Sequence, residues 1–131
     1  MLDDTYNAAS IESVRAAFTA GAARPRTGRL VIVMGDMLEL GEASTETHRT
    51  VGVQAHRVGA DLFIGMGRAS VAAVEEARAA GVRETYASAT FEDTVAHLLK
   101  RVAAGDVVVV KGSRGMRMER VTDALVARLT R

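Results

Sequence analysis

Three short runs of apolar residues constrain the fold of this chain more than any other feature. They are Leu30–Met34, Asp61–Ile64 and Asp106–Val110, and the last contains four consecutive valines. Runs this short and this apolar are typical of strands buried on both faces. Segments with helical spacing of apolar residues separate them, so the pattern predicts an α/β domain. We expect a mostly parallel, doubly wound sheet flanked by about five helices.

Weaker signals complete this pattern. Arg83–Ala87 is a further strand candidate, and Leu2 is expected to be the end of another strand. Apolar residues at helical spacing mark the first and last helices, with Ile11, Val14 and Phe18 in one and Met118, Val121 and Leu125 in the other. The expected start and stop residues of the helices are Gly21, Ser44, Gly59, Gly81, Thr90 with Asp93, and Gly105.

Composition excludes several classes of protein. The length of 131 residues predicts one domain over residues 1–131, and 17 basic against 16 acidic residues argue against a nucleic-acid partner. The absence of cysteine excludes disulfides and thiolate metal sites. No apolar run reaches the roughly 18–20 residues of a membrane span, and Asp3 and Asp4 stand where a signal peptide would be basic. We therefore expect a cytoplasmic protein without membrane insertion.

Polar clusters follow three of the expected strands. They are Asp3–Asn7, Gly35–Gly41 and Lys111–Met116. In an open parallel sheet, ligands bind at the carboxyl ends of the strands. These clusters are therefore the candidate site, although each is also compatible with an ordinary polar turn.

The third cluster has the chemistry of an anion site. Lys111 and Arg114 can bind a carboxylate or phosphate, and Ser113 can add a hydrogen bond near a helix N-terminus. In the first cluster, Asp3 or Asp4 can accept hydrogen bonds from a ribose or help to hold magnesium. The alternative for both clusters is a solvated turn.

The second cluster combines an acid with an apolar loop. Asp36 follows its strand directly, and Met37, Leu38 and Leu40 must pack against their own domain, a neighbouring domain or a ligand. His48 lies in the helix behind this loop, where it can approach the site or serve in packing. The run Gly65-Met66-Gly67 is interpreted as a turn.

Taken together and in this order, the clusters resemble a known family. The matching residues are Asp3–Ala8, Gly35–Gly41 with Ser44, His48, Val51 and Gly52, and Lys111–Met116 with Met118 and Glu119. They resemble the C-terminal domain of the Mur ligases, and within them the D-alanyl-D-alanine-adding (MurF) branch. The resemblance implies a Rossmann-like domain that closes over a central ATP-binding domain. It implies an amide ligase of peptidoglycan precursor synthesis, in which ATP phosphorylates the carboxylate of a UDP-linked muramoyl peptide and the amine of D-Ala-D-Ala attacks.

The resemblance also assigns site residues. Asp4 matches the residue for the ribose hydroxyls, with Asp3, Tyr6 and Asn7 near the nucleotide. Lys111, Ser113 and Arg114 match the loop that receives the amino substrate, where they suit the free carboxylate of the dipeptide, and Asp36 and His48 would line the same cleft. No catalytic residue or metal ligand is expected in this chain. ATP and Mg²⁺ would be bound mostly by the central domain.

One departure from the family pattern affects the nucleotide side. The family continues Tyr-Asn-Ala-Asn-Pro, whereas this chain has Ala9 and Ser10 in the last two positions. Ser10 is expected to cap the first helix one residue later, while a nucleotide contact of the absent Asn would be lost.

We therefore expect part of a three-domain ligase that is inactive without its other domains, which are its expected partners. A free-standing, non-catalytic module that binds a nucleotide or a D-amino-acid peptide is the alternative. A third hypothesis is an amide ligase with another amino substrate.

Overall fold

The computed structural model describes residues 2–3, 10–38 and 40–129. The strands are β1 (Leu2–Asp3), β2 (Leu30–Gly35), β3 (Leu62–Met66), β4 (Glu84–Ser88) and β5 (Val107–Lys111). The helices are α1 (Ile11–Ala23), α2 (Ser44–Arg57), α3 (Ser70–Ala80), α4 (Phe91–Arg101) and α5 (Glu119–Leu129), with 3₁₀ turns η1 (Gly41–Ala43) and η2 (Arg114–Met116). Within these ranges no helix has the length and apolarity needed to span a bilayer.

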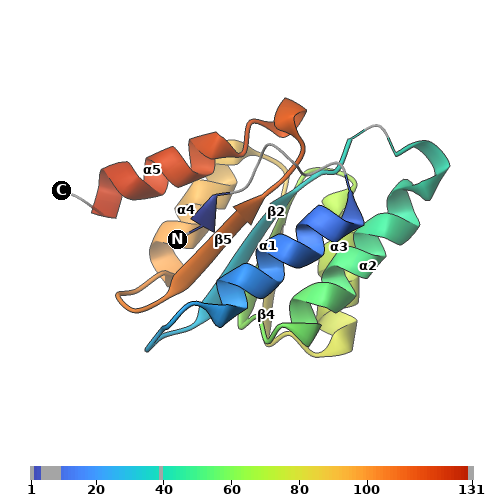
Figure 1. Ribbon diagram of the computed structural model, residues 1–131. Helices are drawn as coiled ribbons and strands as arrows, with labels where there is room; N and C mark the ends of the chain where they lie inside the picture. Colours follow the sequence, from blue (N-terminus) through green and yellow to red (C-terminus); the bar gives the residue numbers. More distant parts are fainter. Residues whose placement is uncertain (1, 4–9, 39, 130–131) are drawn as a thin grey trace.

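The five strands form one sheet in the order β1-β5-β2-β3-β4, and every neighbouring pair is parallel. The chain moves across the sheet from β1 to β4 with α1, α2 and α3 on one face. It then returns to β5, and α4 and α5 cover the other face (Figure 1). The predicted α/β, doubly wound architecture with five helices is confirmed.

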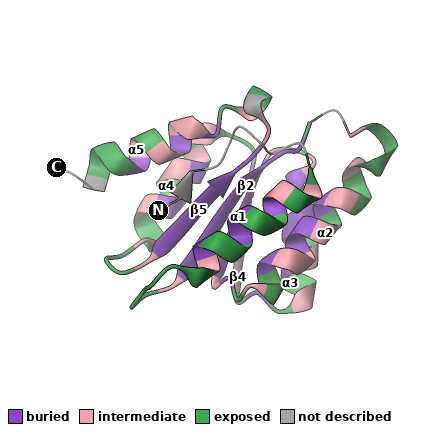
Figure 2. Cartoon of the chain, viewed as in Figure 1, coloured by how far each residue is buried: buried purple, intermediate pink, exposed green. Residues whose placement is uncertain are grey.

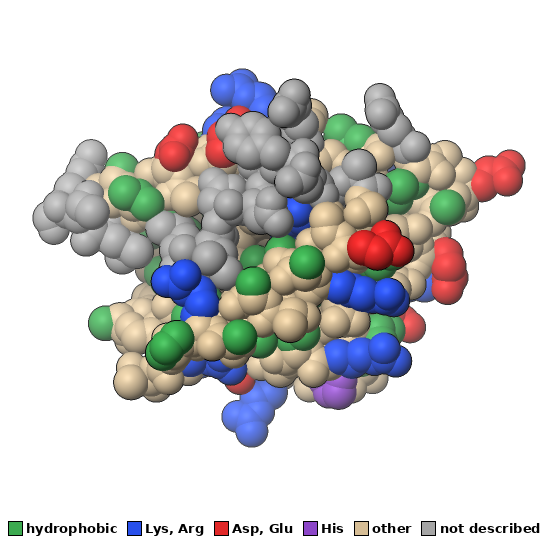
Figure 3. Space-filling view, viewed as in Figure 1, with side chains coloured by type: hydrophobic (Ala, Val, Ile, Leu, Met, Phe, Trp, Pro, Cys, Tyr) green, Lys and Arg blue, Asp and Glu red, His purple; other side chains and the backbone are tan. Residues whose placement is uncertain are grey.

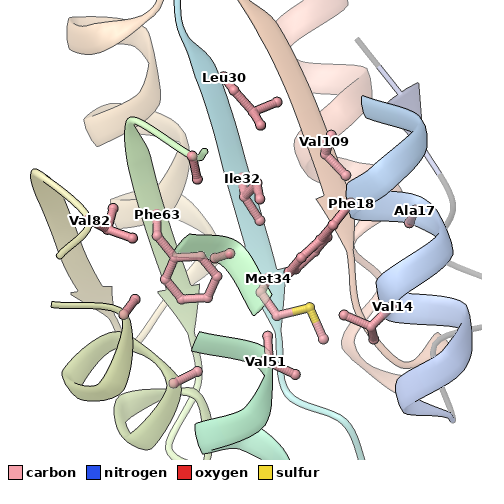
Figure 4. Close-up of a cluster of buried hydrophobic side chains, with 14 of the residues drawn as sticks. Val14, Ala17, Phe18, Leu30, Ile32, Met34, Val51, Phe63, Val82 and Val109 are labelled. Carbon is pink, nitrogen blue, oxygen red and sulfur yellow. The ribbon is translucent and has the colours of Figure 1, made fainter. Parts of the chain in front are cut away.

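The core has two halves, one on each face of the sheet. All six residues of β2 are buried, and they alternate in direction: Leu30, Ile32 and Met34 pack with α1, α2 and α3, whereas Val31 and Val33 pack with α4 and α5. Figure 4 shows the first half, where Phe18 of α1 lies against β2 and β5. Figure 2 shows buried strands between helices whose outer faces are exposed. Two covered faces explain why the strands are continuous apolar runs.

The change of direction in the sheet places the candidate site. Met34 of β2 and Lys111 of β5 are direct partners in the register. The chain then leaves β2 toward α2 on one face and leaves β5 toward α5 on the other. A crevice opens where neighbouring strands diverge in this way, and ligands of doubly wound sheets bind there.

Most strand predictions are confirmed, with one correction. Gly65-Met66-Gly67 is not only a turn, because β3 continues through Gly65 and Met66 and pairs with β4. A Cβ on Gly65 would lie 2.7 Å from Cγ2 of Val74, so the glycine allows α3 to pack closely on the strand. The glycine that indicated a turn is a packing residue inside the strand.

Helix boundaries were predicted less well. Thr90 caps α4, Gly59 and Gly81 follow α2 and α3 with positive φ, and Ser10 caps α1 by accepting the N–H of Ser13 at 3.2 Å, all as predicted.

Three predictions of helix boundaries were wrong. Gly21 lies inside α1, Ser44 is the first residue of α2 rather than its cap, and α4 ends at Arg101 rather than at Gly105. Gly21 is a buried residue of α1, and the 3₁₀ turn η1 precedes α2 where the cap was expected. A short loop lies between the end of α4 and Gly105.

Candidate functional site

The loops after β2 and β5 are joined by Ser113. Its backbone N–H donates to the carbonyl oxygen of Asp36 at 3.2 Å, and its Oγ accepts the backbone N–H of Leu38 at 2.8 Å. The two predicted clusters, 75 residues apart in sequence at this contact, therefore form one structure at the crevice.

Two glycines allow this close approach. A Cβ on Gly112 would lie 3.2 Å from Cα of Gly35 and 2.5 Å from Cγ of Met118. A Cβ on Gly35 would lie 2.5 Å from Sδ of Met118. The side chain of Met118, fully buried just before α5, thus packs against both glycines.

The carboxylate of Asp36 binds the start of α3. It accepts the N–H and the Oγ–H of Ser70 at 2.8 and 2.7 Å and the N–H of Ala69 at 3.3 Å, and the residue is 8% exposed. A carboxylate in this place satisfies unpaired amides and interacts favourably with the helix dipole. Gly67, at φ +116°, leaves room for it, because a Cβ there would lie 2.5 Å from the carboxylate. All these bonds hold the β2 loop against α3.

His48 is fully buried and uses both ring nitrogens. Nε2 accepts the N–H of Met37 at 3.0 Å, and Nδ1 lies 2.7 Å from the carbonyl oxygen of Ser44. Nε2 therefore carries no proton, and the proton sits on Nδ1 and is donated to Ser44. His48 anchors the loop from behind, which fits the packing alternative.

The predicted anion-binding residues lie where β5 ends, next to the loop after β2: Lys111, Ser113 and Arg114. The side chain of Lys111 is fully buried at the end of β5, and the alternation of the strand places it on the α1 side with Val109. Ser113 is half-buried, and Arg114 begins η2. Within the described residues, no acceptor takes the hydroxyl proton of Ser113. The loop after β5 therefore offers the hydroxyl of Ser113 as one oriented donor.

The apolar loop packs mainly on its own domain. Met37 is 2% exposed and belongs to the core, and Leu40 packs against that core from a half-buried position. Leu38 alone is 40% exposed, and its Cδ1 would lie 2.7 Å from a Cβ on Gly115 of η2. The self-packing alternative is confirmed for Met37 and Leu40.

The nucleotide side of the predicted site is only partly visible. Asp4, Tyr6 and Asn7 lie outside the described residues, and Asp3 is described only as the last residue of β1. Its register partner is Val110, so this segment leaves a strand directly beside β5. No group of three or more His, Asp or Glu side chains suitable for a metal occurs in residues 10–38 and 40–129.

A polar cluster that the sequence did not predict lies at the opposite edge of the sheet. Glu84 at the start of β4 pairs with Arg29 at 3.3 Å and with Arg101. Burial alone would raise the pKa of Glu84, but the hydrogen bonds and charges of the two arginines outweigh it and lower this pKa. The ring of His97 in α4 stacks on Tyr86 with 3.8 Å between the ring centroids, and its side chain is 14% exposed. Burial, with the nearby Arg101, lowers the pKa of His97.

Charges of both signs are spread over one face of the molecule. Figure 3 shows basic and acidic side chains interspersed on the face that it presents, with no continuous region of one sign. This distribution agrees with the formal net charge of +1.

Comparison with known proteins decides the family. A family model described as "Mur ligase, glutamate ligase domain" matches residues 1–114. The chain belongs to the Mur ligase family. The matched residues include the first two predicted clusters and Lys111–Arg114 of the third, so the loops after β2 and β5 are features of a Mur ligase domain.

Two curated relatives carry the same enzyme name. UDP-N-acetylmuramoyl-tripeptide–D-alanyl-D-alanine ligase of Escherichia coli is 39% identical over 95% of this Mur ligase domain, and the enzyme of the same name from Mycobacterium tuberculosis is 34% identical over 97%. The domain spans only 26% and 28% of these two relatives.

Solved structures show the same fold. MurF of Thermotoga maritima, crystallised in complex with ADP, superposes with a TM-score of 0.74 at 30% identity, over 92% of this chain and 26% of that one. MurF of Acinetobacter baumannii gives a TM-score of 0.78 at 28% identity, over 93% and 26%. The Rossmann-like fold expected from the resemblance is confirmed.

Proposed function

We propose that this Mur ligase domain forms part of an ATP-dependent ligase that adds D-alanyl-D-alanine to UDP-N-acetylmuramoyl-tripeptide in peptidoglycan precursor synthesis. The names of the relatives support this reaction. Since the chain spans about a quarter of their length, the remaining domains would supply most of the ATP and Mg²⁺ binding and all of the catalytic residues. A cytoplasmic location, with those domains as partners, is part of the same proposal.

The contribution of this domain is to bind the incoming dipeptide in the crevice between β2 and β5. The observation that carries this assignment is the hydrogen bond from the N–H of Leu38 to Oγ of Ser113. Because this oxygen accepts that bond, its hydroxyl proton can be donated to a ligand. Lys111 and Arg114 flank it in sequence. A carboxylate accepts hydrogen bonds from a hydroxyl and from cationic side chains, and Arg can bind it through two parallel bonds. This set suits the free carboxylate of D-Ala-D-Ala and leaves its amine at the other end for the reaction.

Asp36 and His48 belong to this site as the residues that hold its loops. Their observed bonds run to Ser70, Ala69, Met37 and Ser44 rather than into the crevice. Any contact that they make with the dipeptide would therefore be indirect, through the loops.

The adjacent strand end would contact the nucleotide. Asp3 leaves β1 beside β5, and with Asp4, Tyr6 and Asn7 it begins the segment to which the resemblance gives the ribose and its surroundings. The ADP complex of the Thermotoga maritima enzyme supports a nucleotide as cofactor. When bound, ATP supplies the phosphoryl group that activates the acceptor carboxylate, and this segment would help to cover it.

Isothermal titration of the 131-residue chain tests the assignment. D-Ala-D-Ala should bind, whereas its C-terminal amide should bind about ten- to a hundredfold more weakly because a hydrogen bond to a charged group contributes about 1.5–3 kcal/mol. Ser113→Ala and Arg114→Gln should lose affinity by similar factors. Arg117→Gln, three residues after Arg114 on the exposed surface, is the matched control.

Two results would contradict the proposal. Equal binding of the dipeptide and its amide would show that no carboxylate is recognised. Tighter binding of D-glutamate than of D-Ala-D-Ala would favour a ligase with another amino substrate.

A further inference from the structure

We propose that His48 is a positioning residue for Ser113: it sets the direction of the Ser113 hydroxyl through the backbone of Met37 and Leu38. The inference rests on the proposed function only in naming the dipeptide carboxylate as the group that receives this hydroxyl. The structural part concerns a relay from α2 to the crevice and can be tested without any ligand.

The relay begins with a ring that cannot turn. His48 is fully buried in α2, its Nε2 accepts the N–H of Met37 at 3.0 Å, and its Nδ1 donates to Ser44 at 2.7 Å. Rotation of the ring would break both bonds and leave buried polar groups unpaired, which is costly. His48 therefore presents a fixed acceptor to the loop.

The second step is the peptide between Met37 and Leu38. Met37 is held at its N–H by His48 and at its side chain, 2% exposed, by the core. The N–H groups of Met37 and Leu38 belong to successive planar peptide units, which are related only by the φ and ψ angles of Met37. Because Met37 is fixed at its N–H and at its side chain, these two angles are restricted, and with them the direction in which the N–H of Leu38 points. That N–H donates to Oγ of Ser113 at 2.8 Å.

The third step is the hydroxyl itself. A serine hydroxyl has one proton and two acceptor lone pairs, so an accepted bond restricts where the proton can point. The backbone of Ser113 is fixed at both ends, because its N–H donates to Asp36 at 3.2 Å and its carbonyl accepts the N–H of Met116 at 2.9 Å. With Leu38 occupying one side of the oxygen, the proton is directed away from the β2 loop, toward the half-buried mouth of the crevice.

This relay differs from a general packing role in what it predicts. A packing residue can be replaced by an apolar side chain of similar size with an effect only on stability. A positioning residue requires an acceptor at Nε2, so glutamine, whose side-chain oxygen can take that place, should rescue what leucine cannot.

Amide hydrogen exchange in the ligand-free chain is the first test. In His48→Leu, the amides of Met37 and Leu38 should both exchange about tenfold faster, since each loses a hydrogen bond of about 1–1.5 kcal/mol. In His48→Gln both should stay close to the wild type. Ser113→Ala should accelerate Leu38 alone, and His56→Leu, an exposed histidine of the same helix, should change neither.

The dipeptide titration is the second test. His48→Leu should weaken binding of D-Ala-D-Ala by about the same factor as Ser113→Ala, and the double variant should lose little more, because both remove the same oriented donor. If the wild type does not bind the dipeptide at all, the proposed function fails while the exchange result still decides the relay.

Three results would overturn the inference. One is a Leu38 amide whose exchange is unchanged in His48→Leu. Another is full additivity of the losses of affinity in the double variant. The third concerns the wild type and stands even if His48→Leu does not fold: ring nitrogen shifts in NMR that show a proton on Nε2 instead of Nδ1.

Discussion

Replacing Asp36 with alanine should destabilise this domain strongly, although sequence reasoning placed Asp36 among the substrate-binding residues. The substitution removes a carboxylate that accepts three hydrogen bonds at 2.7, 2.8 and 3.3 Å. Two of the donors belong to Ser70, which is fully buried, so water cannot easily replace the lost acceptor.

The magnitude follows from these contacts. Loss of a helix-capping side chain costs about 1 kcal/mol and up to about 2 kcal/mol. A buried donor left without a partner costs about 1–3 kcal/mol more. Because the two contributions overlap at Ser70, we expect the free energy of unfolding to fall by about 2–4 kcal/mol. Native domains have free energies of unfolding of about 5–15 kcal/mol, so the variant should still fold.

Urea denaturation followed by circular dichroism measures this change. The midpoint should fall by about 0.7–4 M, given slopes of about 1–3 kcal/mol per molar urea. Asp36→Asn should lose less, because asparagine is also a good cap. Asp123→Ala, an exposed acid of α5, is the control and should stay within about 0.5 kcal/mol of the wild type. An Asp36→Ala variant as stable as this control would refute the structural role.

Three further predictions concern other parts of the domain. Gly52→Ala should destabilise by about 1–3 kcal/mol in urea, although alanine favours helices, because a Cβ there would lie 2.3 Å from a backbone carbonyl of α3; Thr50→Ala on the same helix should not. Burial, with the nearby Arg101, lowers the pKa of His97, so the folded state binds fewer protons than the unfolded state and the free energy of unfolding should fall as the pH drops below 6.5. In urea titrations over the same pH range, a His97→Phe variant, which keeps a ring against Tyr86, should lose less of its free energy of unfolding. Arginines lower the pKa of Glu84 despite its burial, so Glu84→Gln should cost up to about 1 kcal/mol at neutral pH, and this difference from the wild type should shrink as the pH falls below 4.5.

The sheet could be predicted from sequence because its signals are local. Val107–Val110 is so apolar that only a strand covered on both faces accommodates it, and the glycines after α2 and α3 mark real helix ends. Boundaries failed where a tertiary contact outweighed the local signal. Gly65 resembles a turn residue in sequence, but in the structure it is the place where α3 packs against β3.

The candidate site was predicted in outline but not in its internal contacts. The sequence predicted that the loops after β2 and β5 lie at the same edge of the sheet, because both loops follow parallel strands. It could not show that Ser70 would bind the carboxylate of Asp36, since the partner lies 34 residues away. The role of His48 was likewise left open, because only the structure shows which groups meet its two ring nitrogens.

Chemical-shift mapping by NMR tests the central claim most directly, namely that the crevice between the β2 and β5 loops receives D-Ala-D-Ala. We predict that titration of the labelled chain with the dipeptide moves the amide signals of Gly112–Met116 and of Leu38, while L-Ala-L-Ala at the same concentration leaves them in place. Shifts confined to other surfaces, or no shifts at millimolar dipeptide, would contradict the claim.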